Sequence, residues 1–303
     1  MAKMNTPAMQ KAIKKRSNMR NKGPISPGVS AWRRLTRNKA AMLSLFVIGI
    51  FVVCALIPNI IARYGYDEQN YSEAFMAPCL QHPFGTDNLG RDILSRIIWG
   101  SRMSLFISIT SVAVGLLLGG MLGAIAAFFG GRVDDIIMRL LDILLAIPSM
   151  LLAIALAAAF GSGMLNLIMA IAISDVPRFA RIVRGSVMTI KDNEYVEAAI
   201  CIGNGNLRLL CKHMIPNSLA PIIVQGTLGI AGGILSTSGL SFLGLGIQPP
   251  TPEWGLMLSQ ARQYIRGNWW IVTFPGITIM LAIGAINLLG DGLRDALDPR
   301  LKV

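Results

Sequence analysis

The chain has 303 residues, of which 53% are hydrophobic and only 15% are charged, and its mean hydropathy is +0.56. This composition excludes an ordinary soluble domain and indicates a membrane protein. The net charge of +12 could suggest a nucleic-acid-binding protein, but residues 1–39 hold eleven Lys or Arg and no acidic residue, which leaves 12 − 11 = +1 for the rest. We therefore expect no nucleic-acid partner, and a disordered basic cytoplasmic arm over 1–39 that lies near anionic membrane lipid.

Long uncharged runs predict six membrane-spanning helices, because a helix needs about 20 apolar residues to cross the hydrocarbon core. The first span covers 40–62, and no small-residue cleavage site follows it, so we expect it to be retained. A polar outer segment, 63–102, separates it from the second span. The later spans are expected at 103–131, 136–159, 164–181, 219–234 with a broken or re-entrant end reaching 246, and 267–290.

The second and third spans contain residues with predicted structural roles. Small residues at four-residue spacing in the second span let another helix backbone approach closely, in this chain or in a partner; these are Gly115, Gly119 and Gly123. In the third span Pro148 predicts a kink. Arg139 and Asp142 are expected to pair near the cytoplasmic end of that span, and we favour this over a functional charge inside the membrane.

The sequence carries no motif for catalysis or for a cofactor. It lacks a G-x-x-x-x-G-K-[ST] phosphate-binding loop, an H-E-x-x-H metal motif and a G-x-S-x-G nucleophile turn. The cysteines are scattered without a C-x-x-C pair, so we expect neither a zinc site nor a disulfide framework. We therefore expect a transport subunit that is not an enzyme. An ion-coupled secondary transporter or channel is the alternative, indicated only by the glycine-rich end of the fifth span.

Residues 192–217 are the longest polar stretch enclosed by apolar sequence. Residues 193–202 predict a short helix, and Gly203 predicts its end, because glycine accepts a positive φ angle. After a Gly-Asn turn, Asn206 is expected to cap a second helix, which Pro216 limits. The stretch is therefore predicted to be a helix-turn-helix on the cytoplasmic side.

These residues resemble a known family. Glu197-Ala198-Ala199, Gly203 and Ile215-Pro216 are similar to the Glu-Ala-Ala loop of membrane subunits in binding-protein-dependent ABC importers. The chain departs from the family pattern at His213, where relatives often have an aliphatic residue, and at Ile215, which stands in for a common leucine.

Three further segments, 82–105, 240–255 and 290–299, resemble the permeases of dipeptide, oligopeptide and nickel importers. Within the first of them, residues 92–100 place isoleucines on one side of a helix, so we expect an amphipathic helix on the outer surface. The resemblance covers most of the chain, and it is closest to the second, C-type permease subunit of a peptide transporter.

The resemblance implies an all-α polytopic membrane protein of the type I ABC importer permease kind, with six transmembrane helices and both termini cytoplasmic. It places the permease core at 103–293, with an ATPase-coupling loop at about 185–217, and a cytoplasmic tail at 294–303. Ala198 and Ala199 would keep the coupling helix slim enough to enter a groove of the ATPase.

The same resemblance implies the partners and the setting. These are a second, homologous permease, two ABC ATPase chains that bind ATP and Mg, and an extracytoplasmic solute-binding protein. The location would be the bacterial or archaeal cytoplasmic membrane, and the transported solute a di- or oligopeptide, with glutathione or nickel as alternatives. No substrate-binding residue is identified from the sequence.

The charge distribution predicts the topology. With six spans, the cytoplasmic pieces hold 22 Lys or Arg and ten acidic residues, whereas the outer pieces hold six of each.

Reporter domains fused after Lys39, Asn204 and Val303 are expected to be cytoplasmic, and reporters inserted within 69–87 or 260–266 are expected to be extracytoplasmic. Termini on opposite faces of the membrane would contradict this topology.

Overall fold

The uncharged runs fold into long helices, because backbone amides and carbonyls inside a bilayer have to find their partners within the segment. The computed structural model describes residues 27–297, and over this range the chain is all-helical, as the sequence predicts. Residues 1–26 and 298–303 lie outside the described residues. The expectation of a disordered arm is wrong for residues 27–35, which form a helix. What the sequence predicts for 1–26 and for the end of the tail remains a prediction.

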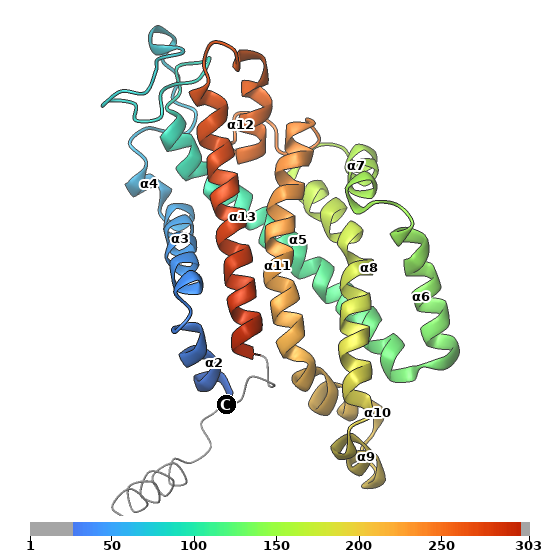
Figure 1. Cartoon of the computed structure of the whole chain (residues 1–303). Coiled ribbons are helices and arrows are strands. Elements are labelled where there is room, and N and C mark those ends of the chain that lie inside the picture. Colours follow the sequence, from blue (N-terminus) through green and yellow to red (C-terminus); the bar gives the residue numbers. More distant parts are fainter. Residues whose placement is uncertain (1–26, 298–303) are drawn as a thin grey trace, which may run out of the picture.

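Figure 1 labels the helices in chain order. They are α2 Pro27–Leu35, α3 Lys39–Leu56, α4 Pro58–Ile61, α5 Ile93–Phe129, α6 Gly131–Leu145, α7 Ser149–Phe160, α8 Met164–Lys191, α9 Glu194–Cys201, α10 Asn206–Arg208, α11 Ile215–Phe242, α12 Trp254–Ala261 and α13 Trp270–Leu297. A π-helical segment, Leu209–Met214, joins α10 to α11, and short 3-10 turns cover Tyr71–Glu73 and Arg262–Tyr264.

Four elements are long and apolar enough to cross a membrane: α3, α5, α13, and α10 with α11 as one continuous helix. Helices α6 and α7 would make a fifth crossing together, although they are bent by 84° at the break before Pro148. The remaining predicted span lies in α8, where Asp175, Arg178 and Arg181 interrupt the apolar sequence. The structure therefore confirms four or five apolar spans, and the count of six remains a prediction.

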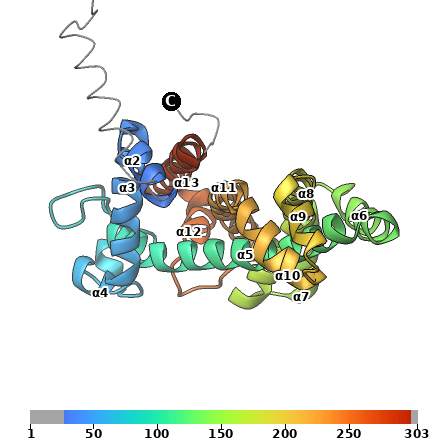
Figure 2. The ribbon, with the colours of Figure 1, turned by 90° about the horizontal axis from the view of Figure 1, so that it is seen from below.

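The long helix α5 crosses the whole subunit. Seen from below in Figure 2, it runs from α3 and α4 on one side to α6 on the other, with α13, α11 and α8 in a row along it. It contacts α3, α8 and α11, and the interface with α8 is the most extensive of the fold. The other helices are thus arranged by their contacts with α5.

The outer end of α5 corrects one expectation. Residues 92–100, predicted as a separate surface helix, are the N-cap and first turns of α5, and the Asp92 carboxylate accepts a hydrogen bond from the Ser95 amide at 2.7 Å. Ile93 and Ile97 are buried, because α12 and α13 pack over them. The predicted boundary at 102/103 is therefore wrong, since the helix begins where the polar segment still continues.

Two other boundaries also differ from the prediction. The first span ends at Leu56 and continues after Ile57 as the short helix α4, because Pro58 begins a new helix. Helix α11 runs unbroken to Phe242, so the predicted break or re-entrant end within 235–246 is wrong. Its glycines serve close packing instead, since a Cβ atom at Gly233 would lie 3.2 Å from the Ser108 carbonyl oxygen of α5.

Gly115, Gly119 and Gly123 form a glycine stripe on α5, which lies against α8 of the same chain. A Cβ atom at Gly115 would lie 3.0 Å from the carbonyl oxygen of Ala172, and Cβ atoms at Gly119 and Gly123 would overlap the carbonyl oxygens of Val176 and Ala180; all three glycines are buried. Backbones this close gain dispersion contacts that larger side chains would prevent. The stripe therefore sets the distance between the two helices.

Changing one glycine of the stripe tests this packing. We expect Gly123→Ala to destabilise the subunit by about 1–3 kcal/mol, because the added methyl group has no space against α8. Gly120→Ala is the matched control, since its Cβ atom would meet the Val183 side chain at an ordinary 3.7 Å. Thermal unfolding of the purified protein measures both, and equal melting temperatures would contradict the proposed close contact.

Candidate coupling site

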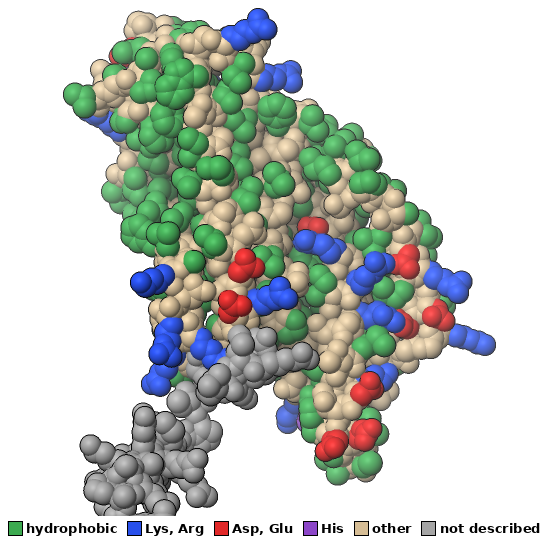
Figure 3. All heavy atoms as spheres, viewed as in Figure 1, with side chains coloured by type: hydrophobic (Ala, Val, Ile, Leu, Met, Phe, Trp, Pro, Cys, Tyr) green, Lys and Arg blue, Asp and Glu red, His purple; other side chains and the backbone are tan. Residues whose placement is uncertain are grey.

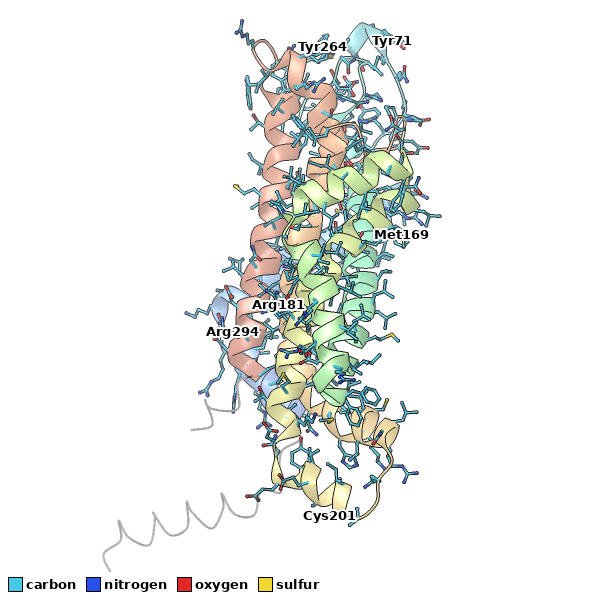
Figure 4. All side chains as sticks on the ribbon, turned by 90° about the vertical axis from the view of Figure 1, so that its right-hand side faces the viewer. Tyr71, Met169, Arg181, Cys201, Tyr264 and Arg294 are labelled. Carbon is cyan, nitrogen blue, oxygen red and sulfur yellow. The ribbon has the colours of Figure 1, made fainter. Side chains whose placement is uncertain are left out.

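The predicted helix-turn-helix forms the lower tip of the molecule. Figure 1 shows α9 and α10 beyond the lower end of α8, and in Figure 4 Cys201 marks this tip, opposite Tyr71 and Tyr264. Charged side chains gather toward the same half of the surface, whereas the upper half is mostly apolar (Figure 3). The tip therefore belongs to the most highly charged end of the subunit.

Apolar side chains anchor α9 to the helices above it. Val196 and Ala199 are 1% and 5% exposed. Val196 belongs to a buried cluster that draws residues from α5, α8 and the π-helical segment: Ala124, Ala127, Val183, Val187, Val196 and Met214. A displacement of α9 would therefore disturb contacts with both α5 and α8.

Lys191, the last residue of α8, makes hydrogen bonds to the lower end of α5, near the apolar cluster around Val196. Its Nζ donates hydrogen bonds to the carbonyl oxygens of Ala127 at 3.2 Å and Phe128 at 2.9 Å. These carbonyls lie in the last turn of α5, where an ammonium group is favoured by the helix dipole. The lower ends of α5 and α8 are thus joined.

The end of α9 adopts the backbone conformation that the sequence predicts. Gly203 has a φ angle of +81°, and its amide donates to the Ile200 carbonyl at 2.9 Å. The Asn204 amide and side-chain Nδ2 both donate to the Ala199 carbonyl, at 3.2 and 3.0 Å. This is a Schellman-type end, which satisfies the last carbonyls of the helix and turns the chain back.

The second half of the hairpin differs from the prediction. Gly205, not Asn206, is the N-cap of α10, and no side chain caps that helix. Pro216 does not end the helix but lies in the first turn of α11, directly after the π-helical segment and inside the continuous stretch Asn206–Phe242. Ile215 is half-buried and Pro216 exposed, so the Ile-Pro pair begins the long helix.

The outer surface of the tip is apolar with an acidic edge. Large apolar side chains are exposed there: Tyr195 by 44%, Ile200 by 55%, Ile202 by 79% and Leu207 by 76%. Glu194 and Glu197 are exposed beside them. Ala198 also faces outward, whereas Ala199 faces the subunit's own core, so the expectation that both alanines keep the outer face slim is wrong for Ala199.

Salt bridges join α8 to α6 above the tip. Arg184 binds Asp134 through two hydrogen bonds, of 2.6 and 2.5 Å, and Arg181 binds Asp142 at 2.6 Å. The expected pairing of Arg139 with Asp142 is therefore wrong, because the carboxylate turns to the neighbouring helix. The sequence gives no signal for this choice, which depends on how α6 lies beside α8.

A buried carboxylate fixes the opposite, upper end of the bundle. Glu253 is fully buried and caps α12 by accepting hydrogen bonds from the amides of Gly255 at 3.0 Å and Leu256 at 2.8 Å. It also accepts one from the Ser104 hydroxyl of α5 at 3.1 Å. Burial raises the pKa of this carboxyl group, and the hydrogen bonds act in the opposite direction. Residues 240–255 resemble the family in sequence, but the sequence did not predict that Glu253 caps a helix.

Within 27–297, no group of three His, Cys, Asp or Glu side chains could hold a metal ion. The structure presents a set of apolar spans and a helical tip that packs against two of them, α5 and α8. This arrangement is that of a polytopic helical membrane protein, and comparison with known proteins gives its family.

The family described as the binding-protein-dependent transport system inner membrane component matches residues 115–303, and the N-terminal TM domain of oligopeptide transport permease C matches residues 26–83. The chain belongs to this family of transport permeases. A di/tripeptide transport system permease protein of Pseudomonas aeruginosa is 47% identical, with 91% of this chain and 93% of the relative covered.

Other relatives support the same family. A dipeptide transport system permease protein of Alkalihalophilus pseudofirmus is 46% identical over 92% of this chain and 91% of the relative. A glutathione transport system permease protein of Pectobacterium atrosepticum is 43% identical over 94% and 95%. Among solved structures, an inward-facing MetNI methionine ABC transporter chain matches with a TM-score of 0.57 at 15% identity, covering 67% of this chain and 96% of that one, which supports the fold alone.

Proposed function

We propose that this chain is one permease subunit of an ATP-driven, binding-protein-dependent importer that moves di- or tripeptides across the bacterial cytoplasmic membrane. The observation that carries the proposal is the identity of 46–47% to dipeptide and di/tripeptide permeases over about nine-tenths of both chains. Glutathione, itself a tripeptide, is the second candidate solute, because a glutathione permease is 43% identical. Family membership favours a permease over an ion-coupled secondary transporter or channel.

The proposed energy source is a pair of ABC ATPase chains, which would bind ATP and Mg, since this sequence has no phosphate-binding loop. We assign their docking site to the tip of the molecule. The exposed side chains of Tyr195, Ile200, Ile202 and Leu207 suit an apolar groove, and Ala198 leaves room beside Glu197. Force on α9 would then reach α5 and α8 through Val196 and the apolar cluster around it.

We propose six crossings: α3, α5, the bent pair α6 and α7, α8, α10 with α11, and α13. The charges of α8 are compatible with a span, because Arg181 and Arg184 pair with α6 and lie toward the charged end. Both termini and α9 would then be cytoplasmic. The core begins with α5 at Ile93 instead of at 103 and extends to 293. The coupling loop at about 185–217 and the tail at 294–303, whose first four residues continue α13, keep the roles expected from the sequence.

Helix α2 is the proposed contact with lipid headgroups. Leu35 packs with Ala296 of α13, whereas Val29 and Trp32 are 47% and 58% exposed beside basic residues. An amphipathic helix with this pattern suits the inner surface of an anionic membrane. A second permease and an extracytoplasmic binding protein complete the proposed assembly.

Reconstitution tests the function. Vesicles containing this chain, a related second permease and two ATPase subunits are expected to take up a radiolabelled dipeptide only with ATP and the binding protein present. Uptake at the full rate without the second permease, or with catalytically inactive ATPases, would contradict the proposal. The complex should also be examined by mass spectrometry for the solute that its binding protein retains.

The coupling role of the tip is tested at Gly203. Gly203→Val is expected to strain the left-handed turn by about 1–2 kcal/mol and to reduce uptake strongly while leaving membrane insertion nearly normal. Gly205→Val is the matched control, since Gly205 has a φ angle of −68° and open space around it. Normal uptake and normal ATPase co-purification of Gly203→Val would show that the tip does not couple the two subunits.

A further inference from the structure

Two opposite charges lie at the middle of α8, on an open face of the subunit. Asp175 and Arg178 are one helical turn apart, halfway along the 28 residues of α8. Their side chains are 17% and 44% exposed. Gly229, halfway along α11, faces them, since a Cβ atom there would lie 3.5 Å from Arg178 Nη2. In Figure 3, acidic and basic side chains meet on this face between α11 and α8.

The Arg178 guanidinium keeps hydrogen-bonding capacity for a further ligand. Its Nη2 is 3.5 Å from Asp175 Oδ1, longer than a charge-assisted hydrogen bond, and the group lies over the Phe179 ring at 4.8 Å. Arg181 and Arg184 on the same helix each bind a carboxylate at 2.6 Å or less. Among the described residues, Arg178 is thus the arginine of α8 without a tight carboxylate partner, and a guanidinium has five donors.

The absence of a side chain at Gly229 helps to keep this position open. A Cβ atom there would lie 2.9 Å from the Phe179 ring and 3.2 Å from Val112 of α5, so a larger residue would push against the ring that supports the guanidinium. The glycine brings α11 close to α8 and α5 without covering Arg178. Arg178 therefore stays exposed because α11 has no side chain at Gly229 to cover it.

An open groove lies below this pair, between α8 and α11, with a volume of about 540 Å³. Polar residues line it beside apolar ones: Arg181, Ser186, Thr189, Asn217 and Ser218 with Ile182, Ile190 and Pro221. Arg181 stands one turn below Arg178. Because Pro221 has no amide hydrogen, the Asn217 carbonyl receives no helix hydrogen bond from it. The groove thus begins one turn below the pair and offers polar groups among apolar ones toward the charged end of the subunit.

Charges at this depth cannot be left against lipid, because charged groups within spans face the bundle interior or a water-filled cavity. We propose that Asp175 and Arg178 form a binding site for the two termini of a short peptide. The guanidinium binds the α-carboxylate and the Asp175 carboxylate binds the α-ammonium group, and the groove is the exit toward the cytoplasm. This assignment rests on the proposed peptide import.

The matched charges are what favour this ligand. A free di- or tripeptide carries one positive and one negative end a short distance apart, and the site presents one group of each sign on the same turn of helix. A single ion would use only one of them. A second permease that placed its own ion pair here would compete for the same groups, so the experiment has to separate a peptide ligand from an intersubunit contact.

The test uses the complex of both permeases and the ATPases in nanodiscs, without the binding protein. Radiolabelled Ala-Ala is expected to bind the wild-type complex, and the dipeptide amide, which lacks the carboxylate, is expected to compete at least tenfold more weakly. Arg178→Gln should weaken binding of Ala-Ala at least tenfold and abolish the difference between the two peptides, and Arg178→Lys should restore part of both. Arg139→Gln, an exposed arginine of α6, is the control and should behave as wild type.

Three results would overturn the site: no binding to the wild-type complex, equal competition by peptide and amide in wild type, or discrimination that survives Arg178→Gln. Loss of the second permease from the Arg178→Gln complex would instead assign the pair to the subunit interface. ATP-driven uptake of Ala-Ala by the complete wild-type system is measured in parallel. If the wild-type system does not take up Ala-Ala, the proposed function is wrong. If it does, but Arg178→Gln leaves peptide binding unchanged, only the proposed binding site is wrong.

Discussion

The close contact between α5 and α8 is the interaction on which the rest of the subunit depends. Gly123 brings the α5 backbone against Ala180, and Lys191 then joins the lower ends of the two helices. Helix α9 leaves α8 at that point and packs back through Val196. The tip, α8 and α5 therefore share contacts at this level, and the proposed motion of the tip would act on α5, which is joined to Glu253 of the α12 N-cap through Ser104.

The charges of α8 have a structural role toward the tip and a proposed binding role one turn higher. Toward the tip its arginines are bound by carboxylates of α6, which compensates their charge and attaches the bent pair to the core. One turn higher, Arg178 has no such partner at hydrogen-bonding distance. A helix that looks too polar to be counted as a span is therefore polar for two separate reasons, and its sequence alone does not distinguish them.

Local features of the chain were predicted well, and long-range contacts were not. The spans at α3, α5 and α13 follow from runs without charge, and the turn at Gly203 follows from the backbone freedom of glycine. The surface helix at 92–100 was wrong because residues far along the chain, in α12 and α13, bury it. The partner of Asp142 and the inward direction of Ala199 depend likewise on where neighbouring helices lie, which no local pattern contains.

The way in which α9 ends has a consequence for how freely the tip can vary. Its direction is set by main-chain hydrogen bonds from Gly203 and Asn204, and the side chains of Ile200 and Ile202 take no part in them. Those two positions can therefore change to suit a different docking partner, such as the proposed ATPase, without altering the path of the chain. Adaptation to a new partner would be concentrated in the exposed side chains, while a change at Gly203 would affect every partner alike.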